Sequence, residues 1–191
     1  MENSSVRKIT GVAILAALVI VLQLIGNYVT LGPISINLAL IPIAIGAIMF
    51  GPLAGAFLGL IDGVLCIVAP STLEFFMPFA PVWTVVTCLV KTSAAGALAG
   101  LVYKLVFKKN DTVAIILSSL LIPVVNTGIF ALASFTVISE AIARLNTANV
   151  NAMKFVFLFV IGWNFIFEFG VTSVLSPTIV KVINIWKKER E

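Results

Sequence analysis

Three charged residues lie inside long apolar stretches of this 191-residue sequence: Asp62, Lys91 and Glu168. A charge at the centre of a lipid bilayer costs about 2.5–3.5 kcal/mol on insertion scales, so a residue of this kind is usually paired or functional. Lys91 either forms a structural ion pair with Asp62 or Glu168, or faces a cavity and binds an anionic ligand. The sequence leaves both interpretations open, and we expect the second.

Neutral polar residues occur at comparable depth in the same stretches. Asn126 follows Pro123, whose ring bends a helix and frees a backbone carbonyl. Asn164 and Glu168 are four residues apart, so they share one helix face. Trp163 belongs either to an aromatic belt at the membrane interface or to a pocket. The residues predicted to converge on a small-molecule site are Lys91, Asn126, Asn164, Asn37, Asp62, Trp163 and Glu168.

The residue types present exclude several kinds of chemistry. The sequence has no His, which excludes His-based triads, metal sites and proton relays. Cys66 and Cys88 lack metal-ligand spacing and a Walker A sequence is absent, so we expect neither a metal nor a cofactor. We therefore expect that the protein is not an enzyme. The alternative is an intramembrane hydrolase that uses Asp62 and Glu168 as a carboxylate pair.

The stretches that carry these residues are long enough to cross a membrane. Charged residues make up 10% of the chain, against about 25% in soluble domains, and none occurs from Ile9 to Ile61. We predict an all-α polytopic membrane protein, a single transmembrane domain over residues 1–191. Its bundle of six helices is predicted at about 9–26, 36–50, 53–68, 80–106, 112–138 and 153–180. The second helix is short for a full crossing, so we expect it to be tilted or partly re-entrant.

The basic residues predict how the chain is oriented in the bilayer. With six crossings, one side holds the termini and the predicted turns after the second and fourth helices, and the polar loops 69–79 and 139–151 lie opposite. Nine basic residues fall on the first side and two on the other, so both termini are predicted to be cytoplasmic. No soluble basic domain exists to bind nucleic acid. The nine are Arg7, Lys8, Lys104, Lys108, Lys109, Lys181, Lys187, Lys188 and Arg190, and the two are Arg144 and Lys154.

Two further features bear on packing and processing. Gly51, Gly55, Gly59 and Gly63 are spaced four residues apart, which makes a smooth stripe that a neighbouring helix can approach closely. The apolar stretch after the first basic pair continues through polar residues without a convincing cleavage site, so we expect no cleavable signal peptide there.

Several local patterns, taken with length and topology, resemble one family of membrane proteins. Ala13-x-x-x-Ala17 is similar to a small-residue motif for docking a membrane partner, and the segments 36–42 and 50–55 are similar to the stretch from a second into a third helix. Lys91, followed by Gly96 and Gly100, fits the same pattern. The sequence therefore resembles the substrate-binding S-components of energy-coupling-factor (ECF) vitamin transporters, over nearly its whole length.

The resemblance implies a function and a set of partners. An S-component in the plasma membrane of a prokaryote captures a vitamin from outside and joins one transmembrane coupling subunit and two ATPase subunits. Ala13 and Ala17 would then dock the coupling subunit, and packing within the chain is the alternative. The segment 123–130 most resembles pantothenate-specific members. Riboflavin, folate, thiamine and pyridoxine stay open as ligands, as does a stand-alone small transporter.

Overall fold

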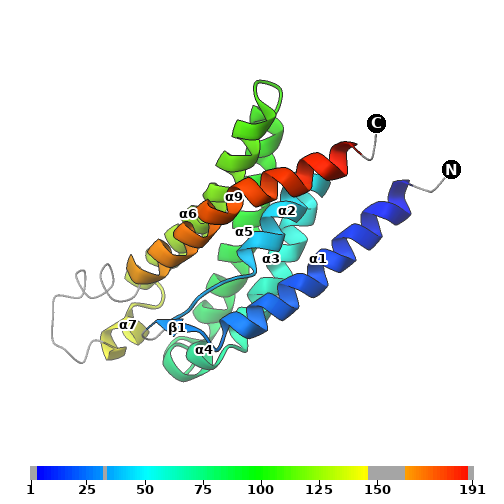
Figure 1. Ribbon diagram of the computed structural model, residues 1–191. Helices are drawn as coiled ribbons and strands as arrows, with labels where there is room; N and C mark the ends of the chain where they lie inside the picture. The colour runs from blue at the N-terminus through cyan, green and yellow to red at the C-terminus, as the bar shows by residue number, and fades with distance from the viewer. Residues whose placement is uncertain (1–3, 32–33, 146–161, 189–191) are drawn as a thin grey trace.

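Apolar helices make up most of the described part of the computed structural model, which covers residues 4–31, 34–145 and 162–188 (Figure 1). One short antiparallel ribbon pairs Thr30 with Ser35 and Leu31 with Ile34. The elements are α1 (Ser4–Gly26), β1 (Thr30–Leu31), β2 (Ile34–Ser35), α2 (Leu40–Phe50), α3 (Pro52–Ile67), α4 (Pro70–Phe75), α5 (Pro81–Val106), α6 (Asp111–Phe135), α7 (Ser139–Leu145) and α9 (Trp163–Lys188).

Helix length separates the helices into two groups. In the described part of the chain, α1, α5, α6 and α9 are long and apolar enough to cross a membrane, whereas α2 and α3 are shorter apolar helices. The 11 residues of α2 rise about 17 Å, roughly half of the hydrocarbon thickness of a bilayer. The prediction of an all-α membrane bundle is therefore confirmed, with a second helix that is short as expected.

The short helix α2 forms the centre of the bundle. It contacts α1, α3, α5, α6 and α9, and its Leu40, Ile43, Ala44 and Ala47 side chains are almost completely buried. A helix that is apolar on all sides is suited to the interior of a bundle or to lipid, and α2 is too short to cross a bilayer alone. Gly51 ends α2 and lets the chain reverse directly into α3. Its φ of 95° is a backbone conformation that glycine adopts without a steric penalty.

Close packing of α3 against α5 is made possible by glycine. Gly55 lies against the backbone of Gly96, and Gly59 lies against the backbone of Thr92 and Ser93. Gly63 likewise lies against the Cys88 carbonyl, so the stripe that the sequence predicted is the α3 surface that α5 covers. The two helices approach closely because no side chain stands between their backbones.

Replacing Gly59 by Ala is expected to destabilise the bundle. An added methyl group would lie only 2.9 Å from the Ser93 Cα atom and closer still to the Thr92 carbonyl. Overpacking of this kind costs about 1–3 kcal/mol, which should appear as a lower thermal unfolding temperature of the purified protein. Gly170→Ala is the matched control, because nothing lies within 4 Å of a methyl group there. Equal unfolding temperatures for the two variants would contradict this account of the stripe.

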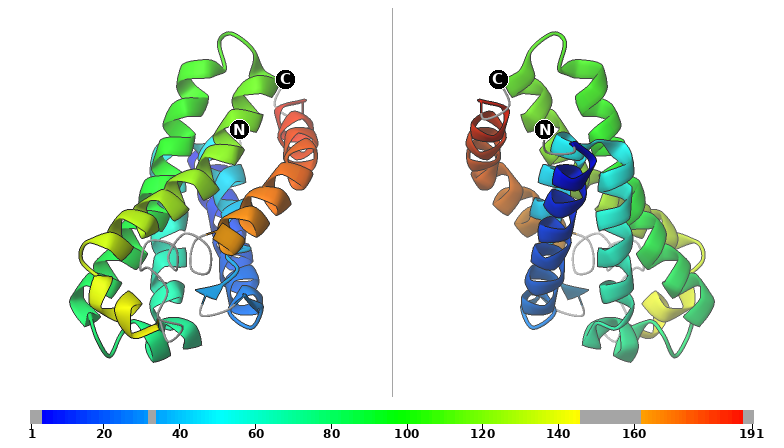
Figure 2. Two further views of the ribbon diagram at one scale, coloured as in Figure 1. Left: turned by 90° about the vertical axis from the view of Figure 1, so that its left-hand side faces the viewer. Right: turned by 90° about the vertical axis from the view of Figure 1, so that its right-hand side faces the viewer.

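Helices α5 and α6 form a hairpin that reaches past the ends of α1 and α9 (Figure 2). The Asn110 side chain accepts a hydrogen bond from the Val113 N–H and so caps the start of α6. The Tyr103 hydroxyl donates to the Asp111 carboxylate at 2.8 Å. These contacts fix the turn of the hairpin at the end of the molecule where α1 begins and α9 ends, opposite α4 and α7 (Figure 1).

The structure differs from the predicted elements in three places. The second helix begins at Leu40 rather than at residue 36, because the Asn37 side chain accepts from the Ala39 N–H and competes with helical bonding. The predicted polar loops contain the short helices α4 and α7. The predicted charged tail at 181–191 is helical as far as Lys188, since Ile183 packs into the core. The start of the sixth predicted helix, at 153–161, lies outside the described residues.

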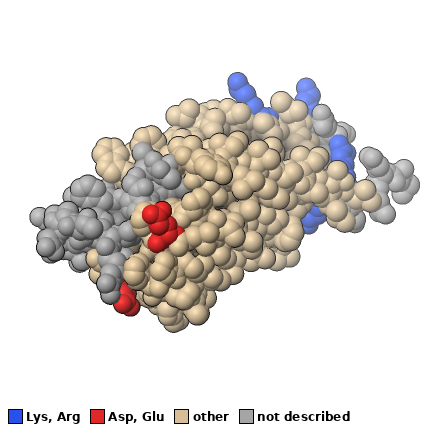
Figure 3. Space-filling view, turned by 90° about the horizontal axis from the view of Figure 1, so that it is seen from below, with Lys and Arg blue, Asp and Glu red and all other residues tan. Residues whose placement is uncertain are grey.

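On one face of the bundle, the basic and the acidic side chains lie toward opposite ends. Basic side chains gather at one end of the face in Figure 3 and acidic side chains lie toward the other. Asp111, at the start of α6, is an acidic residue at the basic end. Lys104 lies in the last turn of α5, at the end that holds the α5–α6 turn, while Glu74 in α4 and Glu140 in α7 lie at the opposite end. This division agrees with the predicted placement of the polar loops on the side away from most basic residues.

Candidate functional site

Six polar residues from five parts of the chain meet inside the bundle, and we call them the polar cluster. They lie where the chain enters α2, and every one is buried to at least nine-tenths. Burial of so many polar groups in an apolar bundle is expensive unless they bond to one another or to a ligand. The members are Gln23 from α1, Asn37 before α2, Asp62 and Cys66 from α3, Asn126 from α6 and Glu168 from α9.

Asn37 joins the two carboxylates of the polar cluster. Its side-chain amide donates to Asp62 Oδ2 at 2.7 Å, and its backbone N–H donates to Glu168 Oε1 at 3.1 Å. Its side-chain oxygen accepts from the Ala39 N–H at 3.0 Å, which fixes the orientation of the amide. Asn37 therefore bonds to both carboxylates from the segment just before α2. Asn37 and Asp62 were both predicted site residues, and the structure brings them together.

Glu168 lies on the face of α9 that is turned toward the bundle, with 3% of its side chain exposed. Its second oxygen, Oε2, accepts from the Asn126 amide at 3.4 Å, so both carboxylate oxygens accept hydrogen bonds. Asn126 comes from the buried side of α6, which continues as a helix through Pro123. Two further predicted residues thus meet in the same cluster.

Several oxygen atoms of the polar cluster lack a partner among the described residues. Asp62 is completely buried, yet its Oδ1 atom accepts no hydrogen bond there, and the same holds for Asn126 Oδ1 and Gln23 Oε1. A buried polar atom without a partner costs about 1–3 kcal/mol. Three acceptors left open in one cluster are therefore suited to a ligand that brings hydrogen-bond donors.

Lys91 is placed beside this cluster by the close contact of α3 with α5. Its Nζ atom lies 5.8 Å from the centre of the Phe130 ring of α6, a distance typical of a cation–π interaction. Asp62 and Glu168 are near enough to attract it electrostatically. Among the described residues, however, neither carboxylate approaches the ammonium group within the 4.0 Å of an ion pair. Among the described residues, Lys91 is therefore near both carboxylates without being paired directly to either.

Two predicted site residues are not placed in the polar cluster. Trp163 begins α9 with 57% of its side chain exposed. Asn164 follows it in the same helix, but its side chain lies outside the described part of the structure. Their role in ligand binding stays a prediction.

Two members of the cluster, Gln23 and Cys66, are not among the predicted site residues. Gln23 donates to Asn27 Oδ1 at 3.0 Å and to Cys66 Sγ at 3.5 Å, and the Asn37 amide lies 4.0 Å from the same sulfur. The four-residue spacing of Gln23 and Asn27 was a usable signal, because it puts both on one face of α1. Cys66 carried no signal, since a thiol in an apolar helix usually packs as a small hydrophobe. In the described residues, no group of three His, Cys, Asp or Glu side chains could hold a metal ion.

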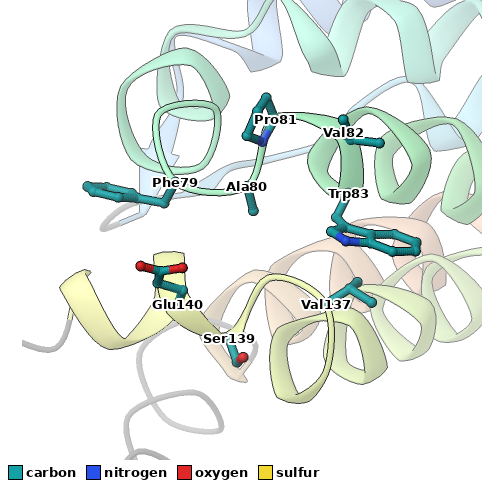
Figure 4. Close-up of a pocket in the computed structure, with 8 residues that line it drawn as sticks. All are labelled: Phe79, Ala80, Pro81, Val82, Trp83, Val137, Ser139 and Glu140. Atoms are coloured by element: carbon teal, nitrogen blue, oxygen red, sulfur yellow. The ribbon is translucent and has the colours of Figure 1, made fainter.

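A separate pocket of about 460 Å³ opens at the end of the bundle that carries α4 and α7. The Glu140 carboxylate lies beneath Phe79 and Ala80, and the Trp83 indole lies over Val137 (Figure 4). At the same end of the bundle, Phe76 of the α4–α5 connection contacts the Phe130 ring edge-on, with centroids 5.9 Å apart. Phe130 therefore lies between this end of the bundle and Lys91.

The sequence was compared with known proteins in three ways. Residues 7–180 match the model of the family described as "ECF transporter, substrate-specific component". Comparison with curated proteins and with solved structures gives no significant match.

This match covers far more than half of the chain. Members of the family are transport proteins, which excludes the intramembrane hydrolase that Asp62 and Glu168 left open. The helical bundle and its internal polar cluster are what a membrane protein that binds a small substrate requires. The chain belongs to the family of substrate-specific components (S-components) of ECF transporters.

Proposed function

We propose that the protein captures a water-soluble vitamin from outside the cell and that the polar cluster with Lys91 binds it. The observation that carries this proposal is the set of open acceptor oxygens on Asp62, Asn126 and Gln23, all in one buried cluster beside a cation. A structural cluster would be expected to satisfy these atoms internally. A vitamin with several polar groups would satisfy them when it binds.

Pantothenate is the ligand we propose first. Its carboxylate suits Lys91, which has no directly paired carboxylate among the described residues. Its amide N–H and two hydroxyl groups are donors that suit the open oxygens of Asn126 and Asp62. The likeness of segment 123–130 to pantothenate-specific members supports the same choice. Riboflavin, folate, thiamine and pyridoxine are the alternatives.

We further propose that the chain works with one transmembrane coupling subunit and two ATPase subunits in a prokaryotic plasma membrane, with both termini in the cytoplasm. The gathering of basic side chains at one end of the bundle supports this orientation. The side chains of Ala13 and Ala17 are exposed on α1, which leaves them available to a partner helix. A stand-alone transporter is the second candidate.

A vitamin panel tests the ligand. The vitamin that binds should raise the thermal unfolding temperature of the purified chain, because a ligand at 100 times its Kd stabilises the folded state by about 2.7 kcal/mol. We expect pantothenate to give the largest shift. A shift with thiamine and none with pantothenate would contradict the pantothenate assignment while leaving the transport function in place.

Isolation of the chain from its native membrane tests the partners. We expect two ATPase subunits and a membrane subunit to co-purify with it, and we expect the chain alone in liposomes to take up no vitamin. Uptake by the isolated chain without ATP would instead support the stand-alone transporter.

A further inference from the structure

We propose that Asp62 binds the anionic group of the vitamin in its protonated form, so that capture of one vitamin anion is coupled to the uptake of one proton. This inference rests on the proposed function, because it takes the polar cluster and Lys91 as the vitamin site. It adds a coupled ion and assigns a role to a buried carboxylate.

A bound anion would change the charge balance of the polar cluster. Among the described residues, Asp62 and Glu168 bring two negative charges and Lys91 brings one positive charge. Counted over these residues, the cluster together with Lys91 carries a net negative charge before a ligand binds. A vitamin carboxylate would add a full negative charge in a region of low dielectric, which is strongly unfavourable. One proton restores the charge that the cluster has without its ligand.

The hydrogen bonds indicate which carboxylate takes the proton. Both oxygens of Glu168 accept hydrogen bonds, from the Asn37 N–H and from the Asn126 amide, so this group is held as an acceptor. Asp62 accepts from the Asn37 amide through Oδ2, while its Oδ1 atom has no partner among the described residues. Oδ1 is thus the position where a proton can be added without breaking a bond. A protonated Oδ1 then donates to the vitamin carboxylate.

The other titratable groups near Asp62 do not offer a better position. Cys66, on the same helix, and Cys88, on α5, are buried thiols, and a thiol that already carries its proton cannot take up another. Lys91 carries its proton as an ammonium ion. Gln23 of α1 and Asn37, which precedes α2, bring only amides to the cluster. The helix α4, which also contacts α3, carries one titratable residue, the exposed Glu74.

The balance of the step is simple. A buffer acid releases one proton, a new O–H bond forms at Asp62 Oδ1, and the vitamin carboxylate accepts a hydrogen bond from it while Lys91 neutralises its charge. Nothing is oxidised or reduced. The vitamin should therefore bind more tightly as the pH falls. Over the pH range in which free Asp62 is ionised and bound Asp62 is protonated, the Kd should rise about tenfold for each unit of pH increase.

Calorimetric titration of the purified full chain tests the coupling with a matched pair of ligands. Pantothenate carries the carboxylate, and panthenol replaces it with a neutral alcohol. Titrations in phosphate and in Tris at one pH reveal the protons taken up, because the two buffers release different heats on ionisation. We expect about one proton for pantothenate and none for panthenol, whose Kd should not change with pH.

Asp62→Asn tests whether the proton taken up on binding goes to Asp62, and Glu74→Gln is the control variant. The amide keeps the shape of Asp62 and its bond to Asn37, so this variant should bind pantothenate with no proton uptake and with a Kd independent of pH. Glu74→Gln changes an exposed carboxylate in α4 and should keep the uptake of one proton. Should Asp62→Asn fail to fold, the two-ligand comparison on the unaltered chain still decides whether binding takes up a proton.

The outcomes separate this inference from the proposed function. Pantothenate binding with no proton uptake, or uptake that persists in Asp62→Asn, would overturn the inference and leave the pantothenate assignment intact. If pantothenate and folate, the candidates that carry a carboxylate, both fail to bind, the inference and the pantothenate assignment both fall. Co-purification with the ATPase subunits would then still support the transport function.

Discussion

Lys91→Ala is expected to weaken vitamin binding about ten- to hundredfold while the protein still inserts and folds. The magnitude follows from the loss of one hydrogen bond between charged groups, which is typically worth about 1.5–3 kcal/mol. The structure adds a reason to expect folding to survive. No carboxylate is paired directly with Lys91 among the described residues, so its removal does not break an ion pair within 4.0 Å.

Calorimetric titration with pantothenate measures this effect, and thermal unfolding of the same sample reports on folding. Lys104→Ala is the matched control, because Lys104 lies in the last turn of the same helix, far from the polar cluster. It removes an equal charge from α5 and should leave the affinity unchanged. An unchanged affinity in Lys91→Ala, with a large loss of thermal stability, would instead assign Lys91 to holding Asp62 and Glu168 in place.

The parts of the fold that the sequence predicts well are those that depend on local properties. Uncharged stretches predicted the long helices, and the four-residue spacing of Gly55, Gly59 and Gly63 predicted a close helix contact. The spacing could not identify α5 as the partner, because any helix with a small-residue surface satisfies it. The helical extension to Lys188 was missed for a related reason, since it depends on the packing of Ile183 against other elements.

In the candidate site, too, the sequence predicts some features and not others. Asp62, Lys91 and Glu168 could be identified from sequence, because a charge in an apolar stretch is rare and needs a reason. The link between the Asp62 and Glu168 carboxylates could not be predicted from sequence, because it uses the backbone N–H of Asn37 as well as its side chain. Whether Lys91 pairs directly with a carboxylate also depends on distances that only the packed helices define.

Ala17→Trp is expected to abolish vitamin uptake and leave vitamin binding nearly normal. Ala13 and Ala17 are exposed on one face of α1, whereas Leu15 and Val19 of the same helix are buried in the bundle. A small-residue strip that faces away from its own bundle lets another membrane helix approach closely, where many weak dispersion contacts add up. The strip and the polar cluster lie at different levels of α1. The strip is near the middle of the helix, whereas Gln23, which belongs to the polar cluster, lies near the end of the helix.

Three measurements on one variant decide between docking and internal packing. If the strip docks the coupling subunit, Ala17→Trp should keep its unfolding temperature and its vitamin affinity, and lose recovery of the complete complex. Leu18→Trp is the matched control, because Leu18 is a bulky side chain that is already 45% exposed on a neighbouring face of the same turn. It should assemble normally. If Ala17→Trp instead loses stability and vitamin affinity while the complex still assembles, the docking assignment is refuted. Overpacking inside the bundle lowers stability by about 1–3 kcal/mol and leaves a partner surface untouched.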